Sequence, residues 1–173
     1  MAKSLKTDRL VLRPLVPVDC SWMVSFWRIE DVYRNTGSIP ANVDNEFVEA
    51  RISAANDGEL AQIACVRMIE EGDQRVGLIS LNRTSTQEAF SLGYAIHPDA
   101  WNKGIATEAG TALLNWTDSF VTPRYYTSGH FADNPASGIV LKRLGFMPCW
   151  RAPVFSAGRQ EKVDHIYMSR MAG

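Results

Sequence analysis

The spacing of apolar residues along the chain distinguishes the expected strands from the expected helices. Apolar and polar residues alternate in a half-buried strand, whereas apolar residues three and four positions apart form one face of a helix. Strands are therefore expected at residues 9–13, 61–69, 75–81, 89–96, 124–131, 147–155 and 165–171. Gly72 and Gly158 fall between consecutive strands of this set, so we expect each to mark the turn of a hairpin.

Two helices are expected in the first third of the chain. Asp19 and Asp44 are residue types favoured at the N-cap, and a helix is expected after each of them. The second of these helices is expected to end near residues 56–58, where an Asn-Asp-Gly sequence interrupts the pattern. The first has aromatic and apolar residues at helical spacing, namely Trp22, Met23, Phe26 and Trp27.

Two further helices are expected in the second half of the chain. One follows Gly104 and ends near residue 120. Its apolar face comprises Ile105, Ala109, Ala112, Leu113, Trp116 and Phe120. The other begins after Asn134, a favoured N-cap, with Pro135 at its first position, and Gly145 is expected to end it.

The order of these elements predicts an α/β or α+β fold around a mixed sheet. The strand at 89–96, the helix after Gly104 and the strand at 124–131 form a βαβ unit, so the two strands should be parallel. A length of 173 residues fits one domain, and we expect residues 1–173 to form it.

Composition and charge exclude several classes of protein. The formal net charge of −1 argues against nucleic-acid binding by bulk electrostatics, so any anion site must be local. No apolar run approaches the roughly 18 residues that a membrane-spanning helix needs. The N-terminal residues have no apolar core after their lysines, so they are not a secretory signal, and a cytoplasmic location is expected.

The cysteines and histidines do not form a recognisable metal-binding pattern. Cys20, Cys65 and Cys149 are odd in number and lack metal-type spacing, so we expect buried, reduced thiols. A catalytic cysteine is the alternative, although no His or acidic partner supports it in sequence. The histidines are also scattered, which argues against a metal site; they are His97, His130 and His165.

The segment at residues 101–109, Trp-Asn-Lys-Gly-Ile-Ala-Thr-Glu-Ala, has the clearest functional pattern. It joins an expected strand to an expected helix, and the free N–H groups and dipole at a helix start can bind an anion. Gly104 would let a ligand approach the backbone, and Ala106 keeps the next turn small, which suits a diphosphate. The segment lacks the spacing of a Walker loop or a dinucleotide fingerprint, and an ordinary strand-to-helix connection is the alternative.

A second segment, residues 134–146, follows about one helix and one strand later and reads Asn-Pro-Ala-Ser-Gly-Ile-Val-Leu-Lys-Arg-Leu-Gly-Phe. Together the two segments resemble the GNAT superfamily of N-acetyltransferases. The opening residues 7–15, Thr-Asp-Arg-Leu-Val-Leu-Arg-Pro-Leu, are similar to the first strand of the branch that includes the ribosomal-protein N-terminal acetyltransferases. The resemblance extends over residues 7–171, nearly the whole chain.

This resemblance implies a fold and a cosubstrate. The implied fold is a single GNAT-like domain whose mostly antiparallel sheet has flanking helices and one parallel strand pair that splays apart. The cosubstrate is acetyl-CoA, whose pantetheine arm would bind like an added strand beside the main chain of Ile96 and its neighbour His97. Its pyrophosphate would bind the turn formed by Asn102, Lys103, Gly104, Ile105, Ala106 and Thr107.

The second segment would contact the reactive end of the cosubstrate. By resemblance, Asn134 would contact the pantetheine amide, and Ser137 would point at the sulfur and protonate the leaving thiolate. From the residues alone, the pair has a structural alternative, because Asn is a favoured N-cap and Ser is common in a first helical turn. Glu108, in the second turn of the preceding helix, is expected to be structural because the helix dipole stabilises a carboxylate there.

The general base is the point where this chain departs from its relatives. Members of the branch often have Glu three residues before the Tyr of a Gly-Tyr pair, and Ser91 occupies that position here. Serine is not a comparable base without an activating partner. The candidates to replace it are Glu88, His130, Asp133 and an ordered water. Of these, His130 has the most suitable intrinsic pKa, with a surface or core role as its alternative.

The resemblance implies transfer of an acetyl group from acetyl-CoA to a primary amine, either a protein N-terminus or a small molecule. The acceptor pocket would come from residues 19–56, whose aromatic residues also suit a core: Trp22, Trp27, Tyr33 and Phe47. An acetyl-CoA-binding regulatory module with weak or no catalysis is the alternative, and Ser91 favours it. The resemblance is also compatible with a homodimer.

Overall fold

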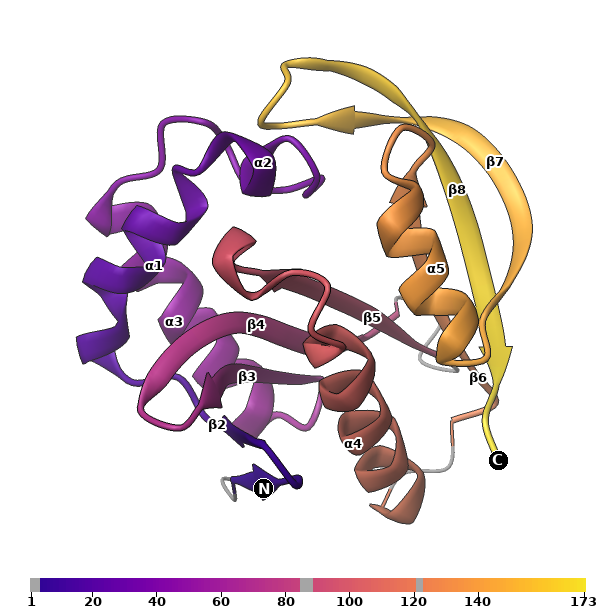
Figure 1. Ribbon diagram of the computed structural model, residues 1–173, viewed down its shortest axis with the longest axis horizontal. Helices are drawn as coiled ribbons and strands as arrows, with labels where there is room; N and C mark the ends of the chain where they lie inside the picture. The colour runs from indigo at the N-terminus through magenta and orange to yellow at the C-terminus, as the bar shows by residue number, and fades with distance from the viewer. Residues whose placement is uncertain (1–3, 85–88, 121–122) are drawn as a thin grey trace.

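One mixed sheet with helices on both faces organises the described residues (Figure 1). The computed structural model describes residues 4–84, 89–120 and 123–173. The sheet has eight strands in the order β1-β2-β3-β4-β5-β6-β8-β7. The strands are β1 (Leu5–Lys6), β2 (Leu10–Arg13), β3 (Ala64–Glu71), β4 (Gln74–Arg83), β5 (Ala89–Ile96), β6 (Tyr125–Phe131), β7 (Met147–Ser156) and β8 (Glu161–Met171).

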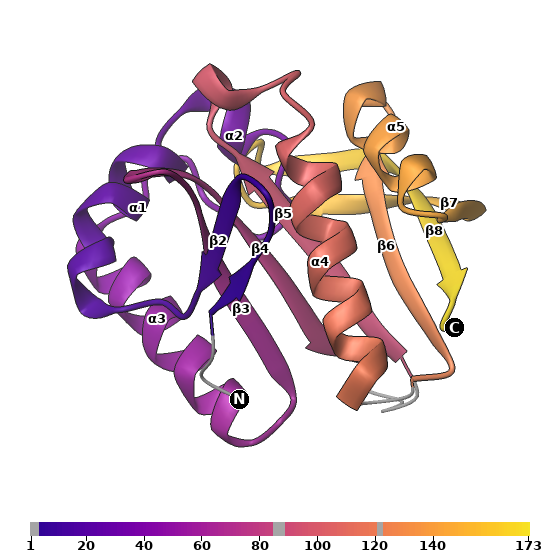
Figure 2. The same cartoon turned by 60° about the horizontal axis from the view of Figure 1, so that its bottom comes forward.

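The helices are divided between the two faces of the sheet (Figure 2). Helices α1 and α3 cover one face, and α4 and α5 cover the other. The helical elements are η1 (Pro17–Asp19), α1 (Cys20–Trp27), α2 (Glu30–Tyr33), α3 (Asn45–Leu60), η2 (Pro98–Ala100), α4 (Ile105–Phe120) and α5 (Pro135–Arg143). The element order and the fold class therefore agree with the prediction from the sequence.

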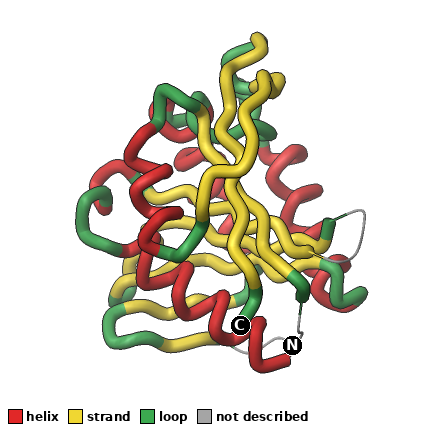
Figure 3. Tube along the Cα trace, turned by 90° about the vertical axis from the view of Figure 1, so that its right-hand side faces the viewer, coloured by secondary structure: helices red, strands yellow, loops and turns green. Residues whose placement is uncertain are grey.

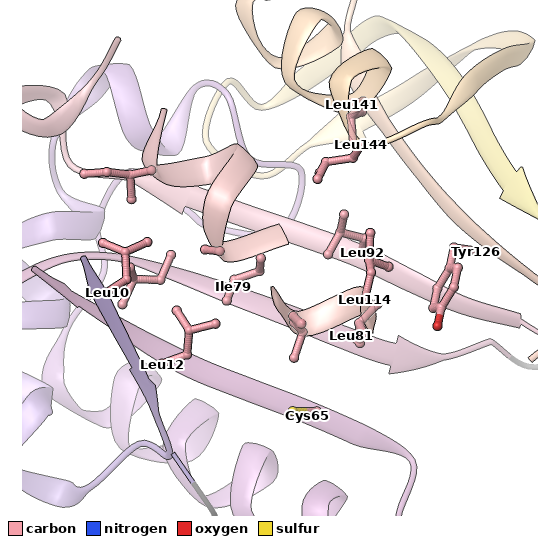
Figure 4. Close-up of a cluster of buried hydrophobic side chains, with 14 of the residues drawn as sticks. Leu10, Leu12, Cys65, Ile79, Leu81, Leu92, Leu114, Tyr126, Leu141 and Leu144 are labelled. Carbon is pink, nitrogen blue, oxygen red and sulfur yellow. The ribbon is translucent and has the colours of Figure 1, made fainter. Parts of the chain in front are cut away.

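The core under α4 and α5 follows from the apolar pattern of the sequence (Figure 4). Leu10 and Leu12 alternate along β2 and are almost completely buried, as expected for one face of a strand. The predicted stripe on α4 packs against them, and Ile105, Ala109 and Leu113 are each at most 1% exposed.

The opposite core joins α1 and α3 to the sheet through Met23, Trp27, Val48, Met68 and Leu78. It matters for function because several of its residues also border a cavity described below. This core includes residues of the predicted aromatic helix, so the sequence pattern located it correctly.

Asp19 fixes the start of α1 in a way that the sequence did not predict. It occupies the N-cap position, but its side chain makes no capping hydrogen bond to α1. The fully buried carboxylate instead accepts hydrogen bonds from Arg13 (2.7 and 2.8 Å), Arg75 (2.9 Å) and the Val16 N–H (2.9 Å). A buried carboxylate needs such partners, so the ion cluster rather than a cap explains this residue.

The two parallel strands pair over only a short distance. Strand β5 is parallel to β6, as predicted, but the register runs only from Ala89↔Tyr125 to Ser91↔Thr127. Both strands continue beyond these pairs, β5 to Ile96 and β6 to Phe131. The strands therefore separate toward their carboxyl ends and leave a gap in the sheet.

Strands β7 and β8 complete the sheet as a long antiparallel hairpin, which faces the viewer in Figure 3 with its tip uppermost. The predicted turn at Gly158 lies in the connection between these strands, and Gly72 occupies the β3–β4 turn with a φ of 60°. Both hairpin predictions are thus confirmed.

Some boundaries differ from the expectations. Helix α3 continues to Leu60 and so delays the start of β3 to Ala64, and β8 begins at Glu161, before the predicted residue 165. The short elements β1 and α2 were not predicted, because two to four residues carry too little periodicity. Cys20 and Cys65 are buried as expected, but Cys149 is exposed on the edge strand β7, so that expectation was wrong for it.

Candidate active site

The turn between η2 and α4 has the geometry of an anion site. Asn102 and Gly104 have φ angles of 61° and 77°, which place both in the left-handed region. A Cβ atom at Gly104 would meet only the Arg9 guanidinium, 3.7 Å away, so the backbone is open to a ligand. The Thr107 hydroxyl in the first turn of α4 is buried and has no hydrogen-bond partner among the described residues. An open backbone and an orphaned hydroxyl at a helix start fit a phosphate group.

A clamp between the N-terminal strands and α4 holds this turn. Arg9 donates to the Lys103 carbonyl (3.0 Å) and to the Glu108 carboxylate (2.7 and 2.9 Å). Glu108 also accepts from the Thr7 hydroxyl (2.6 Å). Burial raises the pKa of Glu108, but the hydrogen bonds from Thr7 and Arg9 outweigh it and lower the pKa. Glu108 is therefore structural, as expected, whereas the role of Arg9 was not predicted.

The gap between β5 and β6 exposes backbone groups of β5. The His97 N–H donates to Val76 on the β4 side, so by strand alternation the N–H groups of Tyr94 and Ile96 face the gap. At the start of the gap, the Ser128 hydroxyl donates to the Leu92 carbonyl (2.8 Å) in place of a strand partner. The Ile96 N–H is therefore oriented as its predicted main-chain hydrogen bond to a ligand in the gap requires.

His97, by contrast, lies away from the gap. Its N–H points toward β4, and its ring stacks on Phe26 at a centroid distance of 5.9 Å. It lines neither of the two cavities described below. The structure thus does not bring His97 to the predicted cofactor site.

Trp101 holds the end of β5, because its indole N–H donates to the Ile96 carbonyl (2.7 Å). This role was not predicted.

The side chains of Tyr94 and Ser137 meet across the gap, next to the start of α5. Asn134 caps α5 by accepting from the Ser137 N–H (3.2 Å), as the sequence predicts. The Ser137 hydroxyl lies 2.7 Å from the Tyr94 hydroxyl, which also donates to the Ser137 carbonyl (3.0 Å). Burial raises the pKa of Tyr94 to about 12, although the hydrogen bond with Ser137 opposes this. Tyr94 therefore keeps its proton at neutral pH.

Two cavities lie at this gap, and they share residues there. The first, about 590 Å³, is lined by the turn before α4 and by α5, and we term it the donor cavity. The second, about 420 Å³, is lined by α1, α3 and the central strands, and we term it the acceptor cavity. The residues common to both are Asn35, Thr36, Tyr94, Ala95 and Ser137.

The predicted cofactor residues converge on the donor cavity with few exceptions. Its lining includes Ile96, Asn102, Gly104, Ile105, Ala106, Thr107, Asn134 and Ser137. Lys103 is absent from this lining, and the contact it makes at the turn is through its carbonyl, which accepts from Arg9.

Two histidines line the acceptor cavity, His130 on β6 and His165 on β8. Glycines on neighbouring elements make room for their rings. A Cβ at Gly138 would lie 2.6 Å from His130 Nε2, and a Cβ at Gly129 would lie 2.2 Å from His165 Cε1. Side chains other than hydrogen at these two positions would displace the imidazoles.

The hydrogen bonds of the two rings define what they can do. His130 Nδ1 lies 2.8 Å from the Phe131 carbonyl, which can only accept, so Nδ1 donates and Nε2 keeps a lone pair in the neutral ring. His165 Nδ1 is buried without a partner, and burial, with a smaller effect of His130, lowers the pKa of His165. His165 was expected only as one of three scattered histidines, so its place in this cavity was not predicted.

The other base candidates are less suited to the role. Ser91 lies in the last paired register of β5 and β6 and lines neither cavity. Asp133 borders the donor cavity but is bound to Arg159 (2.7 and 3.1 Å), and this hydrogen bond lowers its pKa. Glu88 lies outside the described residues.

The aromatic residues of the acceptor half have mixed roles. Trp27 lines the acceptor cavity, whereas Trp22 stacks on Phe26 at a centroid distance of 4.8 Å. Phe47 contacts the edge of Trp27 and also lies beneath Arg51. Within the described ranges, no helix is both long and apolar enough to cross a membrane, and no group of three or more potential ligands could hold a metal.

The chain belongs to the acetyltransferase (GNAT) domain family, because the model of that family matches residues 9–147. This places it in the class of acyltransferases that use acetyl-CoA. The splayed parallel pair, the anion-binding turn and the N-cap of α5 are the parts of the structure that carry the predicted resemblance.

Individual relatives agree with this assignment. An uncharacterized N-acetyltransferase of Bacillus subtilis (strain 168), YoaA, is 26% identical over 149 residues, which cover 82% of this chain and 81% of that protein. RimL, a ribosomal L7/L12 α-N-protein acetyltransferase solved with coenzyme A, has a TM-score of 0.86 at 15% identity and 98% coverage of both chains. Spermidine N-acetyltransferase from Vibrio cholerae, solved with CoA and spermine, has a TM-score of 0.80 at 15% identity, covering 96% of this chain and 97% of that one. At these identities the two structures establish the fold.

Replacement of Gly104 by Glu should weaken acetyl-CoA binding at least about tenfold, or ~1.4 kcal/mol. The substitution introduces a side chain and a negative charge where the diphosphate would bind, and it strains a residue with a φ of 77°. Isothermal titration calorimetry measures the effect. Gly72→Glu is the matched control, because Gly72 also has a positive φ, 60°, but lies in the β3–β4 turn. Equal affinities of the Gly104 and Gly72 variants would remove the turn from the binding site.

Proposed function

We propose that this protein transfers an acetyl group from acetyl-CoA to a primary amine, on a protein N-terminus or a small molecule. The observation that supports this most strongly is the meeting of the donor and acceptor cavities at the β5–β6 gap. A thioester in one cavity and an amine in the other could approach each other beside Tyr94 and Ser137, which line both. Positioning of two reactants in this way can supply a large part of a rate enhancement.

The residues of the donor cavity suit the parts of acetyl-CoA. The N–H groups at the start of α4, with Gly104 and Thr107, would hold the diphosphate. The unpaired main chain of β5 at Tyr94 and Ile96 would hydrogen-bond the amides of the pantetheine arm, as an added strand does. Acetyl-CoA supplies an acyl group already activated as a thioester, so the protein need not form an acyl-enzyme.

The chemistry is a direct displacement. A bond forms between the amine nitrogen and the acyl carbon while the carbon–sulfur bond breaks, so the sulfur leaves with the electron pair. Ser137 donates its hydroxyl proton to that sulfur. Tyr94, whose protonated hydroxyl lies 2.7 Å away, then returns a proton to Ser137 and takes up another from solvent. A backbone N–H that faces the gap stabilises negative charge on the carbonyl oxygen.

His130 is best placed to take the proton that the amine loses. It lines the acceptor cavity, and its hydrogen bond to Phe131 leaves the Nε2 lone pair available. An α-amine has a pKa near 8, below the roughly 10.4 of a lysine side chain, so it needs less help from a base. An α-amine is therefore the easier acceptor, because a lysine ε-amine must lose a more tightly held proton.

The second candidate function is an acetyl-CoA-binding regulatory module without turnover. Ser91, in place of the usual carboxylate, is the observation that favours it. The two functions differ in one measurable respect, the appearance of free CoA thiol and of acetylated amine.

The test is incubation of the protein with acetyl-CoA and a panel of peptides and small amines, followed by mass spectrometry and thiol detection. Acetylated amine and CoA in equal amounts are expected.

In the same assay, His130→Gln should lower kcat about 10²-fold with acetyl-CoA affinity unchanged, because a general base typically contributes at least that much. Binding of acetyl-CoA with no product from any amine would favour the regulatory module. An undiminished kcat in the His130 variant would exclude it as the base.

Removal of the Ser137 hydroxyl should lower kcat about 10²-fold, because Ser137→Ala removes the proton donor to the leaving sulfur. The Asn134 cap accepts from the main-chain N–H of residue 137, so that hydrogen bond and the fold should persist. Steady-state kinetics and acetyl-CoA titration separate the two effects. If turnover matches that of the unmodified protein, Ser137 serves only the helix start.

A further inference from the structure

The charge of the acceptor cavity is unbalanced. Of the described residues that line it, none is an aspartate or a glutamate. The charged side chain among them is Arg51, and the imidazoles of His130 and His165 are the other ionisable groups besides Tyr94. The donor cavity differs, since Asp31 and Asp133 both line it.

Arg51 is held at the acceptor cavity without a carboxylate partner. Its guanidinium donates to the Ser38 carbonyl (3.1 Å) and lies 5.1 Å from the centroid of the Phe47 ring. The side chain is exposed and forms no ion pair with a described carboxylate. By comparison, Arg159, near the same side of the molecule, is neutralised by Asp133 (2.7 Å). Arg51 thus presents a positive charge that no described carboxylate neutralises.

This charge distribution discriminates between amines. A second ammonium group in the cavity would lose hydration without gaining a counterion, and it would be repelled by Arg51. A carboxylate, in contrast, could accept two parallel hydrogen bonds from a guanidinium. The repulsive contact for dications is as important for selectivity as the attractive one for anions.

We propose that the acceptor is an amine whose reacting group is its only cation and whose remainder carries a carboxylate bound by Arg51. A free amino acid and a peptide with an acidic residue near its N-terminus share this chemistry, whereas a polyamine does not. The inference rests on the proposed acetyltransferase activity and adds the substrate class to it.

The test compares three amines with the same six-carbon chain and different far ends: ε-aminocaproate, hexylamine and hexamethylenediamine. The expected order of kcat/KM is carboxylate above neutral above diamine, with the carboxylate roughly three- to fivefold above the neutral amine and the diamine at least about tenfold below it. A diamine that reacts as well as the carboxylate would overturn the inference while leaving the acetyltransferase function in place. Failure of every amine, including peptides, would overturn that function and the inference with it.

Variants of Arg51 identify the residue responsible. Arg51→Glu should reverse the order of the charged amines, and Arg51→Gln should abolish the advantage of the carboxylate over hexylamine. Lys6→Glu makes the same change of charge on the exposed strand β1 and should leave the order unchanged. The Gln variant removes the positive charge without adding a negative one, so it serves if the Glu variant does not fold. An unchanged preference in either Arg51 variant would contradict the proposal.

A final pair of substrates distinguishes the two sources of the carboxylate. Free glutamate and an amidated peptide that begins Ser-Glu each combine an α-amine with a carboxylate. The matched amidated peptide that begins Ser-Gln has the α-amine but no carboxylate. A kcat/KM for free glutamate above that for the Ser-Glu peptide assigns a small-molecule acceptor. A kcat/KM for the Ser-Glu peptide above those for free glutamate and the Ser-Gln peptide assigns a protein N-terminus. Equal rates for Ser-Glu and Ser-Gln, with no reaction of glutamate, would contradict the proposal.

Discussion

The early end of pairing between two parallel strands is the constraint on which the site depends. Strands β5 and β6 are paired only as far as Ser91↔Thr127, and beyond this point the sheet can no longer satisfy its own backbone groups. Unpaired N–H groups inside a protein are costly unless a ligand or water takes them. The gap is therefore both a defect in the sheet and a place where an extended ligand such as pantetheine gains hydrogen bonds. The turn before α4 and the start of α5 lie on either side of it, so one ligand could reach both.

Small residues and ion pairs shape the two cavities that meet at this gap. Glycines 129 and 138 leave the space into which His165 and His130 fit, so two imidazoles line the acceptor cavity. On the donor side, Arg9 and Glu108 neutralise each other and hold the turn without placing a free carboxylate near a diphosphate. The donor and acceptor cavities thus differ in the charged and ionisable side chains that line them.

Most of the fold could be predicted from the sequence because its elements are long and periodic, as the α4 stripe and the parallel pair illustrate. The turn before α4 and the Asn134 cap were also predictable, since both depend on local residue types. Contacts between distant segments were not. Arg9 lies 94 residues from the carbonyl it binds in Lys103, and Tyr94 meets Ser137 only because α5 packs across the gap. The side-chain direction of His97 likewise depends on strand register, which residue type alone does not reveal.

A crystal structure of the protein with coenzyme A would test the central claim most directly. We expect the pantetheine arm to lie between β5 and β6, with its amides hydrogen-bonded to the main chain of Tyr94 or Ile96. We also expect the diphosphate at Gly104 and the sulfur beside Ser137. Coenzyme A bound at another surface, or a β5–β6 pair that closes and remains closed when coenzyme A is present, would contradict the claim.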